Sequence, residues 1–168
     1  MQYLLRLLRG CLIIFQRTLY WLTLGHFPPP FVSVNVIICD GDQALLIDRR
    51  DGLGLGLPGG FVGLKEKVEK AAAREVQEET GLKVELGRLV TVLSGKRRGS
   101  HIYATCLIYE ARITGDKVTR DSVEGKCRWI PLGQIETHRF AIDHFEALKL
   151  YRESKSHESA DSEPNLRS

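Results

Sequence analysis

The stretch Gly60–Leu82, GFVGLKEKVEKAAAREVQEETGL, decides how this 168-residue chain is interpreted. It contains three closely spaced glutamates, Glu75, Glu78 and Glu79, and closes on Gly81 and a leucine. Residues three and four apart share one face of a helix, so these carboxylates are expected to converge on one patch. Like charges so close together destabilise a helix unless a cation lies among them. Hard divalent cations bind carboxylates together with substrate phosphates, so the stretch predicts a metal site on a helix face.

The spacing of this stretch resembles the Nudix box, the signature of the Nudix hydrolase family. The family writes it as G-x5-E-x7-R-E-U-x-E-E-x-G-U, with U an aliphatic residue. Every specified position is filled at its required spacing, by Gly60, Glu66, Arg74, Glu75, Val76, Glu78, Glu79, Gly81 and Leu82. The match is highly specific, and it sets aside the plainer interpretation of a solvated acidic helix face.

The resemblance extends from about residue 31 to residue 151. Nudix domains carry an L-P-G-G turn before the box and a W-x-P-L segment near their end, and this chain has Leu57–Gly60 and Trp129–Leu132. The implied fold is α/β (α+β), a Nudix-type α/β/α sandwich with a mixed sheet. Gly63 and Lys65 depart from the usual G-G-x-x-E-x-G-E pattern, and Lys65 places a bulky cation where glycine commonly turns.

The resemblance implies hydrolysis of a nucleoside diphosphate linked to another moiety, with Mg²⁺ or Mn²⁺ required. Bound metal neutralises phosphate oxygens, orients the diphosphate and acidifies the attacking water. The resemblance implies that the metal is bound by Glu75, Glu78, Glu79 and the carbonyl of Gly60. It also implies catalytic roles for Glu78, Glu75 and Arg74. One of these glutamates, or a glutamate elsewhere, could instead deprotonate the water, and the sequence does not separate those roles.

Three charged residues are assigned supporting roles. Arg74 is expected to hold the carboxylates by ion pairing rather than to contact phosphate. Glu66 falls at the predicted helix start, where negative charge is favourable, and is either structural or an outer partner of the metal. Glu124 lies where many relatives carry an extra acidic residue on a loop facing the site, which makes it a candidate base or ligand.

Four cations are candidate contacts for substrate phosphates, because charge-assisted hydrogen bonds to phosphate are strong. They are Arg49, Lys96, Arg97 and Arg98. The last three belong to the polar turn 94–100, SGKRRGS, and the alternative for this turn is a solvated hairpin tip.

The order of predicted elements agrees with a mixed sandwich. Runs of β-branched and aromatic residues predict strands at 31–39, 43–49, 84–93, 101–113 and 126–130. Composition predicts a helix at 67–80, ended by Gly81, and a closing helix at 140–151.

Composition is that of an ordinary globular protein, with 43% hydrophobic and 27% charged residues. A net charge of +3 gives no reason to expect nucleic acid as a partner. The resemblance implies a nucleotide-type small molecule as the substrate. The four cysteines include no C-x-x-C pair, which favours buried thiols and a reducing, cytoplasmic compartment.

The first 25 residues contain no acidic side chain and are mostly apolar. At about 100° per residue the polar side chains fall within about 120° of one another on a helix. These are Gln2, Arg6, Arg9, Gln16, Arg17 and Thr23. An amphipathic helix with a basic stripe is typical of peripheral contact with a membrane, here at the inner surface. Packing on its own domain or on a second subunit, as in a homodimer, stays open.

The predicted organisation is an N-terminal helix at 1–27, a Nudix domain at 31–152 and a disordered tail at 153–168. The tail has one apolar residue larger than alanine, too few to order it.

Two alternatives to an active diphosphate hydrolase remain. One is a catalytically silent Nudix domain that binds a nucleotide or protein, although every charged box position is intact. The other is an RNA 5′-pyrophosphohydrolase, suggested by the basic turn at 96–98. The motifs of the ADP-ribose, dinucleoside polyphosphate and NADH branches are absent at the expected places, so the sequence does not select the substrate.

Overall fold

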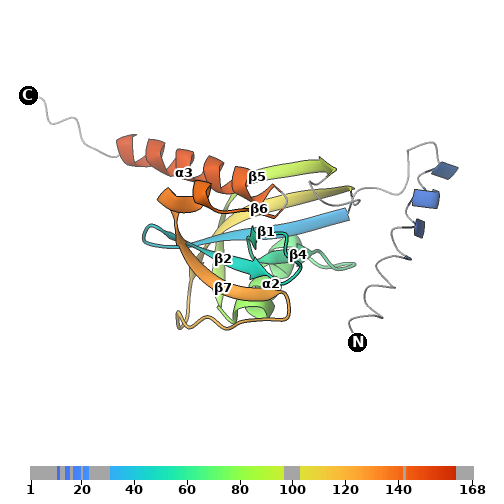
Figure 1. The fold of residues 1–168 in the computed structure, drawn as a ribbon, viewed down its shortest axis with the longest axis horizontal. Helices are drawn as coiled ribbons and strands as arrows, with labels where there is room; N and C mark the ends of the chain where they lie inside the picture. The colour runs from blue at the N-terminus through green and yellow to red at the C-terminus, as the bar shows by residue number, and fades with distance from the viewer. Residues whose placement is uncertain are drawn as a thin grey trace, which may run out of the picture.

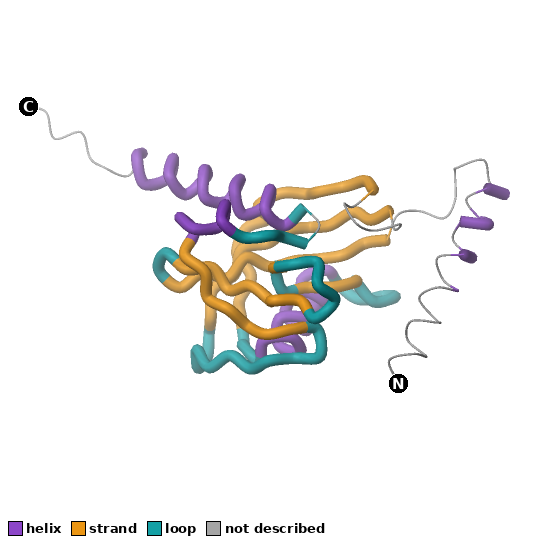
Figure 2. Tube along the Cα trace, in the orientation of Figure 1, coloured by secondary structure: helices purple, strands orange, loops and turns teal. Residues whose placement is uncertain are grey.

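A computed structural model describes residues 31–96, 103–141 and 143–161, with residues 11, 14, 15, 17–19, 21 and 22 before them. The described strands gather between helix α2 on one side and helix α3 on the other (Figures 1 and 2). In chain order the elements are β1 (Phe31–Asp40), β2 (Gln43–Arg49), β3 (Leu55–Gly56), β4 (Gly59–Phe61), α2 (Val68–Thr80), β5 (Val84–Lys96), β6 (Tyr103–Ile113), β7 (Gly125–Pro131), the 3₁₀ helix η1 (Leu132–Thr137) and α3 (His144–Asp161).

The sheet is mixed and is organised around β1. Its order is β3-β2-β1-β6-β5, with β4 paired to β1 and β7 paired to β2. Strands β1 and β6 run parallel over eight residue pairs, from Phe31↔Ala104 to Ile38↔Ala111. The other pairs are antiparallel. A strand with neighbours on both sides loses its exposed edge, which explains why β1 is a near-continuous apolar run.

Two apolar cores lie on opposite faces of β1, because successive side chains of a strand point to opposite sides. Val34, Val36 and Ile38 pack with α2, whose contribution comes from Ala71, Ala72 and Val76. Ile37 packs on the other face with side chains from η1 and α3, namely Ile135, Ala147, Leu148 and Tyr151. The fold is therefore an α/β/α sandwich with a mixed sheet, which confirms the predicted class.

Helix α2 begins one residue later than predicted and ends as predicted. Gly81 takes the left-handed conformation, φ +79°, and its N–H donates to the carbonyl of Gln77. The N–H of Arg120 donates to Thr80 O at 2.9 Å, and its guanidinium donates to Gln77 O at 3.4 Å. A cation from the β6–β7 loop thus lies at the helix C-terminus, where it favours the helix dipole and offsets the acidic side chains nearby.

The closing helix differs from the prediction at both ends. It runs from His144 to Asp161, so it starts four residues late and occupies much of the segment expected to be disordered. Arg88 donates to Ser154 Oγ at 2.7 Å, and Lys155 lies 3.7 Å from the carboxylate of Glu110. These polar contacts to the sheet order a segment whose own composition is too polar to predict it. Residues 162–168 lie outside the described part of the chain.

Only part of the predicted N-terminal helix can be compared with the structure. Residues 11, 14, 15, 17–19, 21 and 22 are helical, and the remainder of 1–27 lies outside the described residues. No helix among the described residues is long and apolar enough to cross a membrane. Of the cysteines, Cys106 is buried, Cys39 and Cys127 are half-buried, and Cys11 is exposed. The expected burial of the thiols is therefore complete for Cys106 and partial for Cys39 and Cys127.

Gly59 is predicted to be indispensable to the pairing of β4 with β1. Its φ is +149°, and a Cβ there would lie 2.1 Å from the carbonyl oxygen of Val34. We expect Gly59→Ala to lower the free energy of unfolding by about 3 kcal/mol or more, measured by urea denaturation. The control is Gly41→Ala, where φ is +62° and no atom lies within 4 Å, so only about 1 kcal/mol of backbone strain is expected. Equal losses in the two variants would contradict the crowding argument.

Candidate active site

The Leu57–Gly60 turn is held against β1 by backbone and side-chain hydrogen bonds. The N–H of Val36 donates to Pro58 O at 2.9 Å, and the buried side chain of Asn35 donates to Leu57 O at 3.2 Å. The N–H of Leu57 donates to Nδ1 of His144, buried at the start of α3, at 3.0 Å. Groups from β1 and from α3, far apart in the sequence, therefore fix the turn that precedes the box.

Two glutamates of α2 face the two glycines of this turn. The N–H of Gly59 donates to Oε2 of Glu79 at 2.8 Å. A Cβ at Gly60 would lie 2.6 Å from the carboxyl group of Glu75, so only glycine lets β4 approach that carboxylate so closely. Glu75 and Glu79 are four residues apart and share one face of the helix. The glycine that opens the box therefore meets glutamates from its far end, because β4 lies directly against α2.

Arg74 binds three glutamates at once. Its Nε and Nη2 donate to the two oxygens of Glu66, each at 2.9 Å, in a bidentate pair. Its Nη1 donates to Glu75 at 2.8 Å and to Glu78 at 3.3 Å. The ion pairing expected for Arg74 is thus present. A planar guanidinium with five donors can join these carboxylates in fixed directions, which a lysine could not do.

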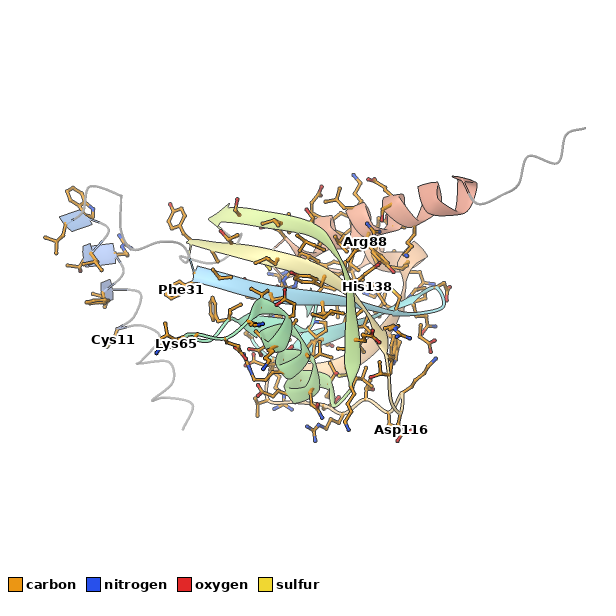
Figure 3. The ribbon with its side chains drawn as sticks, turned by 180° about the vertical axis from the view of Figure 1, so that it is seen from behind. Cys11, Phe31, Lys65, Arg88, Asp116 and His138 are labelled. Carbon is orange, nitrogen blue, oxygen red and sulfur yellow. The ribbon has the colours of Figure 1, made fainter. Side chains whose placement is uncertain are left out.

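Glu66 is tied to the loop that joins β4 to α2. Besides the Arg74 pair, it accepts a hydrogen bond from the N–H of Gly63 at 2.8 Å. The hydrogen bonds from Arg74 and Gly63 lower the pKa of Glu66 to about 2. Lys65, labelled in Figure 3, has φ +64°, so the backbone makes the left-handed turn for which relatives use glycine. The loop keeps its shape despite the lysine, at a cost in strain.

The two carboxylates nearest Gly59 and Gly60 are partly dehydrated. Burial raises the pKa of Glu79 to about 7, against a lowering by the Gly59 hydrogen bond, and the charges of Glu75 and Glu124 raise it further. Burial also raises the pKa of Glu75, although Arg74 opposes this. Two partly buried carboxylates held close together form an oxygen donor set that suits a divalent cation.

Glu78 stands apart from the other two predicted metal ligands. Its side chain is 60% exposed and is directed to Arg74. Within the described residues no three acidic, histidine or cysteine side chains form a ready-made metal cage. The expected convergence of three carboxylates is therefore incomplete in this structure: Glu75 and Glu79 lie together at Gly60, while Glu78 lies at their edge.

The loop before β7 brings a further acid to the site. Glu124 lies close enough to raise the pKa of Glu79, and its carbonyl accepts a hydrogen bond from the N–H of Arg50. Arg49 also lies within electrostatic range of Glu79 and Glu124, with its guanidinium paired to Asp51. The structure thus gathers both sequence candidates around Glu79.

The basic turn predicted at 94–100 can be placed only in part. The backbone of Lys96 ends β5, paired with Tyr103 of β6, and Arg97 and Arg98 lie outside the described residues. The candidate phosphate contacts from this turn stay predictions.

The comparisons with known proteins agree with this geometry. A model of the NUDIX domain family matches residues 29–151, which is most of the chain. The chain belongs to the Nudix hydrolase family. This Nudix chain is 30% identical over 130 residues to the ADP-ribose pyrophosphatase of Methanocaldococcus jannaschii, with 76% of each protein covered. It is 32% identical over 126 residues to a MutT-like protein of Streptomyces ambofaciens, covering 71% of this chain and 79% of that protein.

Solved Nudix structures share the fold. The NUDIX domain of Shewanella oneidensis NrtR, complexed with ADP ribose, superposes with a TM-score of 0.63 at 22% identity. The superposition covers 76% of this Nudix chain and 90% of the other. At this level of identity the likeness concerns the fold alone.

Three side chains that position the site were not found from the sequence. Asn35 and His144 hold the Leu57–Gly60 turn, and Arg120 joins the end of α2 to the loop that carries Glu124. The residues around His144 in the sequence predict no role for it in the site. Its partner lies 87 residues away, so no local pattern signals the contact.

Lys65→Gly is predicted to stabilise the Nudix domain by about 1 kcal/mol, because glycine adopts φ +64° without a steric penalty. The measurement is the free energy of unfolding in urea. Leu64→Gly is the neighbouring control: its φ is not positive, so this change only increases the entropy of the unfolded chain and should destabilise. Destabilisation by both glycines would show that Lys65 is not strained.

The Glu66–Arg74 pair predicts a stability loss at acid pH. Because the folded pKa of Glu66, about 2, lies below its ordinary value of 4.5, its contribution is complete above pH 4.5. That contribution should be lost as the pH falls from 4.5 towards 2. We expect unfolding free energies measured across this range to fall less steeply for Glu66→Gln than for the unaltered protein. Parallel curves for the two proteins would exclude this source of acid sensitivity.

Proposed function

We propose that this Nudix hydrolase cleaves the diphosphate bond of a nucleoside diphosphate linked to another moiety, with Mg²⁺ or Mn²⁺ bound at the box. The observation that carries the proposal is the pairing of Glu75 and Glu79 with the Gly59–Gly60 turn, at the box positions where acid and glycine are specified. The raised pKa of Glu79 supports it, because burial and the charges of Glu75 and Glu124 disfavour an ionised carboxylate that a bound cation would stabilise.

Divalent metal at this site would neutralise phosphate oxygens and acidify the attacking water. Glu75, Glu79 and the carbonyl of Gly60 would hold it, with Glu78 turning in from the edge. Arg74 binds Glu75 and Glu78 through its guanidinium, so it acts on the carboxylates and not on the substrate.

A proton acceptor for the attacking water is the remaining requirement. Glu124 is a candidate because it lies near Glu79 and outside the Arg74 network, on the loop before β7. Arg49 is placed to meet a phosphate at the same end of the site if it leaves Asp51.

ADP-ribose is the first substrate to test, because the similar protein of Methanocaldococcus jannaschii is named for it. The screen should continue with NADH, nucleoside triphosphates, dinucleoside polyphosphates and triphosphorylated RNA, each with Mg²⁺ and with Mn²⁺. Release of a mononucleotide from ADP-ribose and absence of turnover in chelator are the expected results. Absence of turnover for every diphosphate would favour a silent, ligand-binding domain instead.

Glu79→Gln is predicted to reduce kcat/KM at least about 100-fold, because a carboxamide keeps the size of the side chain but removes the charge that a metal requires. The carboxamide oxygen can still accept the hydrogen bond from Gly59, so the thermal unfolding midpoint should not fall. Glu69→Gln is the matched control, because Glu69 is exposed in the first turn of the same helix. Activity that survives Glu79→Gln would contradict the assignment of Glu79 to metal binding.

A further inference from the structure

One end of the molecule carries large apolar side chains on its surface. In the described part of the N-terminal segment, Ile14, Phe15, Trp21 and Leu22 are between 64% and 82% exposed. Four exposed side chains of this size within nine residues are unusual for a solvated helix, since isolated exposed apolar residues are the rule. Such a surface indicates a partner.

The folded domain adds apolar side chains at the same end. Leu64, at the tip of the β4–α2 loop, is 96% exposed, and Phe61 is 51% exposed. Val32 and Tyr103, at the starts of β1 and β6, are also exposed. The N–H of Val62 donates to Val32 O, which joins the loop to the start of β1. The loop tip and the first residues of these two strands therefore form one apolar edge.

The described N-terminal residues and this edge lie toward the same end of the molecule. In Figure 3 Cys11, Phe31 and Lys65 are all at one end, far from Asp116. The described N-terminal residues end at Leu22, nine positions before β1 begins at Phe31. Two apolar surfaces at the same end of the molecule can contact a single flat partner at the same time.

Charge identifies the partner. Residues 1–25 contain Arg6, Arg9 and Arg17 and no acidic residue. On the domain, Lys65 and Lys67 flank the loop tip beside Leu64, and both are exposed. A lysine occupies position 65 although the backbone conformation there favours glycine. Apolar side chains framed by cations match the interface of an anionic lipid bilayer, and each cation close to such a surface strengthens binding about fivefold.

We propose that this end of the molecule binds the surface of an anionic lipid bilayer. The N-terminal helix lies in the interface with its apolar face inserted, and the loop tip at Leu64 makes a second insertion. This contact is peripheral. It does not depend on the proposed reaction.

Vesicle flotation with the full chain tests the proposal. We expect the protein to float with phosphatidylcholine vesicles that contain about 30% phosphatidylglycerol, and to bind pure phosphatidylcholine vesicles at least about tenfold more weakly. Binding to the anionic vesicles should fall as salt is raised, because the Debye length shortens. Equal binding to both vesicle types, or no binding to either, would overturn the proposal.

Two single variants separate the two insertions. Trp21→Asp and Leu64→Asp should each reduce the partition coefficient at least about tenfold, since each removes an apolar side chain and adds a repelled charge. Val118→Asp is the matched control, because Val118 is 79% exposed on the β6–β7 loop, away from this end. All three should keep the thermal unfolding midpoint of the unaltered protein, which excludes misfolding as the cause.

Self-association is the competing use of the same surface. Sedimentation velocity without lipid would then show a dimer that Trp21→Asp dissociates, and vesicles would recruit neither protein. That pair of results would replace the lipid bilayer with a second copy of the chain. A monomer in solution that floats with anionic vesicles supports the proposal.

Discussion

The guanidinium of Arg74 is the interaction on which the site depends. It forms a bidentate pair with Glu66 and also donates to Glu75 and Glu78, so one cation directs three of the four box carboxylates. Without it, like charges on adjacent turns of one helix would repel and turn out to solvent. The pair with Glu66 also anchors the loop between β4 and α2. The same contact therefore sets both the direction of the carboxylates and the path of the chain that leads to them.

Several charged residues of the site are locally destabilising, and contacts from the surrounding fold compensate for them. Glu78 and Glu79 lie at the C-terminal end of α2, where negative charge opposes the helix dipole. Arg120, from a loop distant in sequence, supplies a cation there and bonds the last turn. Glu79 is half-buried near the charge of Glu75, and the N–H of Gly59 stabilises its charge by a direct hydrogen bond. Such locally destabilising charges are expected at a ligand-binding site, where residues are not selected for stability alone.

Sequence reasoning predicted β1, β2, β5, β6 and β7 in order, and the boundaries of α2 to within one residue, because periodicity and Gly81 act locally. It did not predict β3 and β4, which are too short to show a periodicity. It was wrong for α3, which extends to Asp161, because composition could not reveal that Ser154 and Lys155 would find partners on β5 and β6. Helical spacing places the carboxylates on one face of α2, but it does not decide which partner each side chain reaches.

The sequence by itself determined the family, through nine residues at fixed spacing, and hence which side chains could meet a diphosphate. Tertiary structure alone decided how they are held. Asn35 from β1 and His144 from α3 fix the Leu57–Gly60 turn, and β4 presses Gly60 against Glu75. The reason is physical: helical spacing is a property of neighbouring residues, whereas a hydrogen bond across 87 residues exists only after the layers have packed.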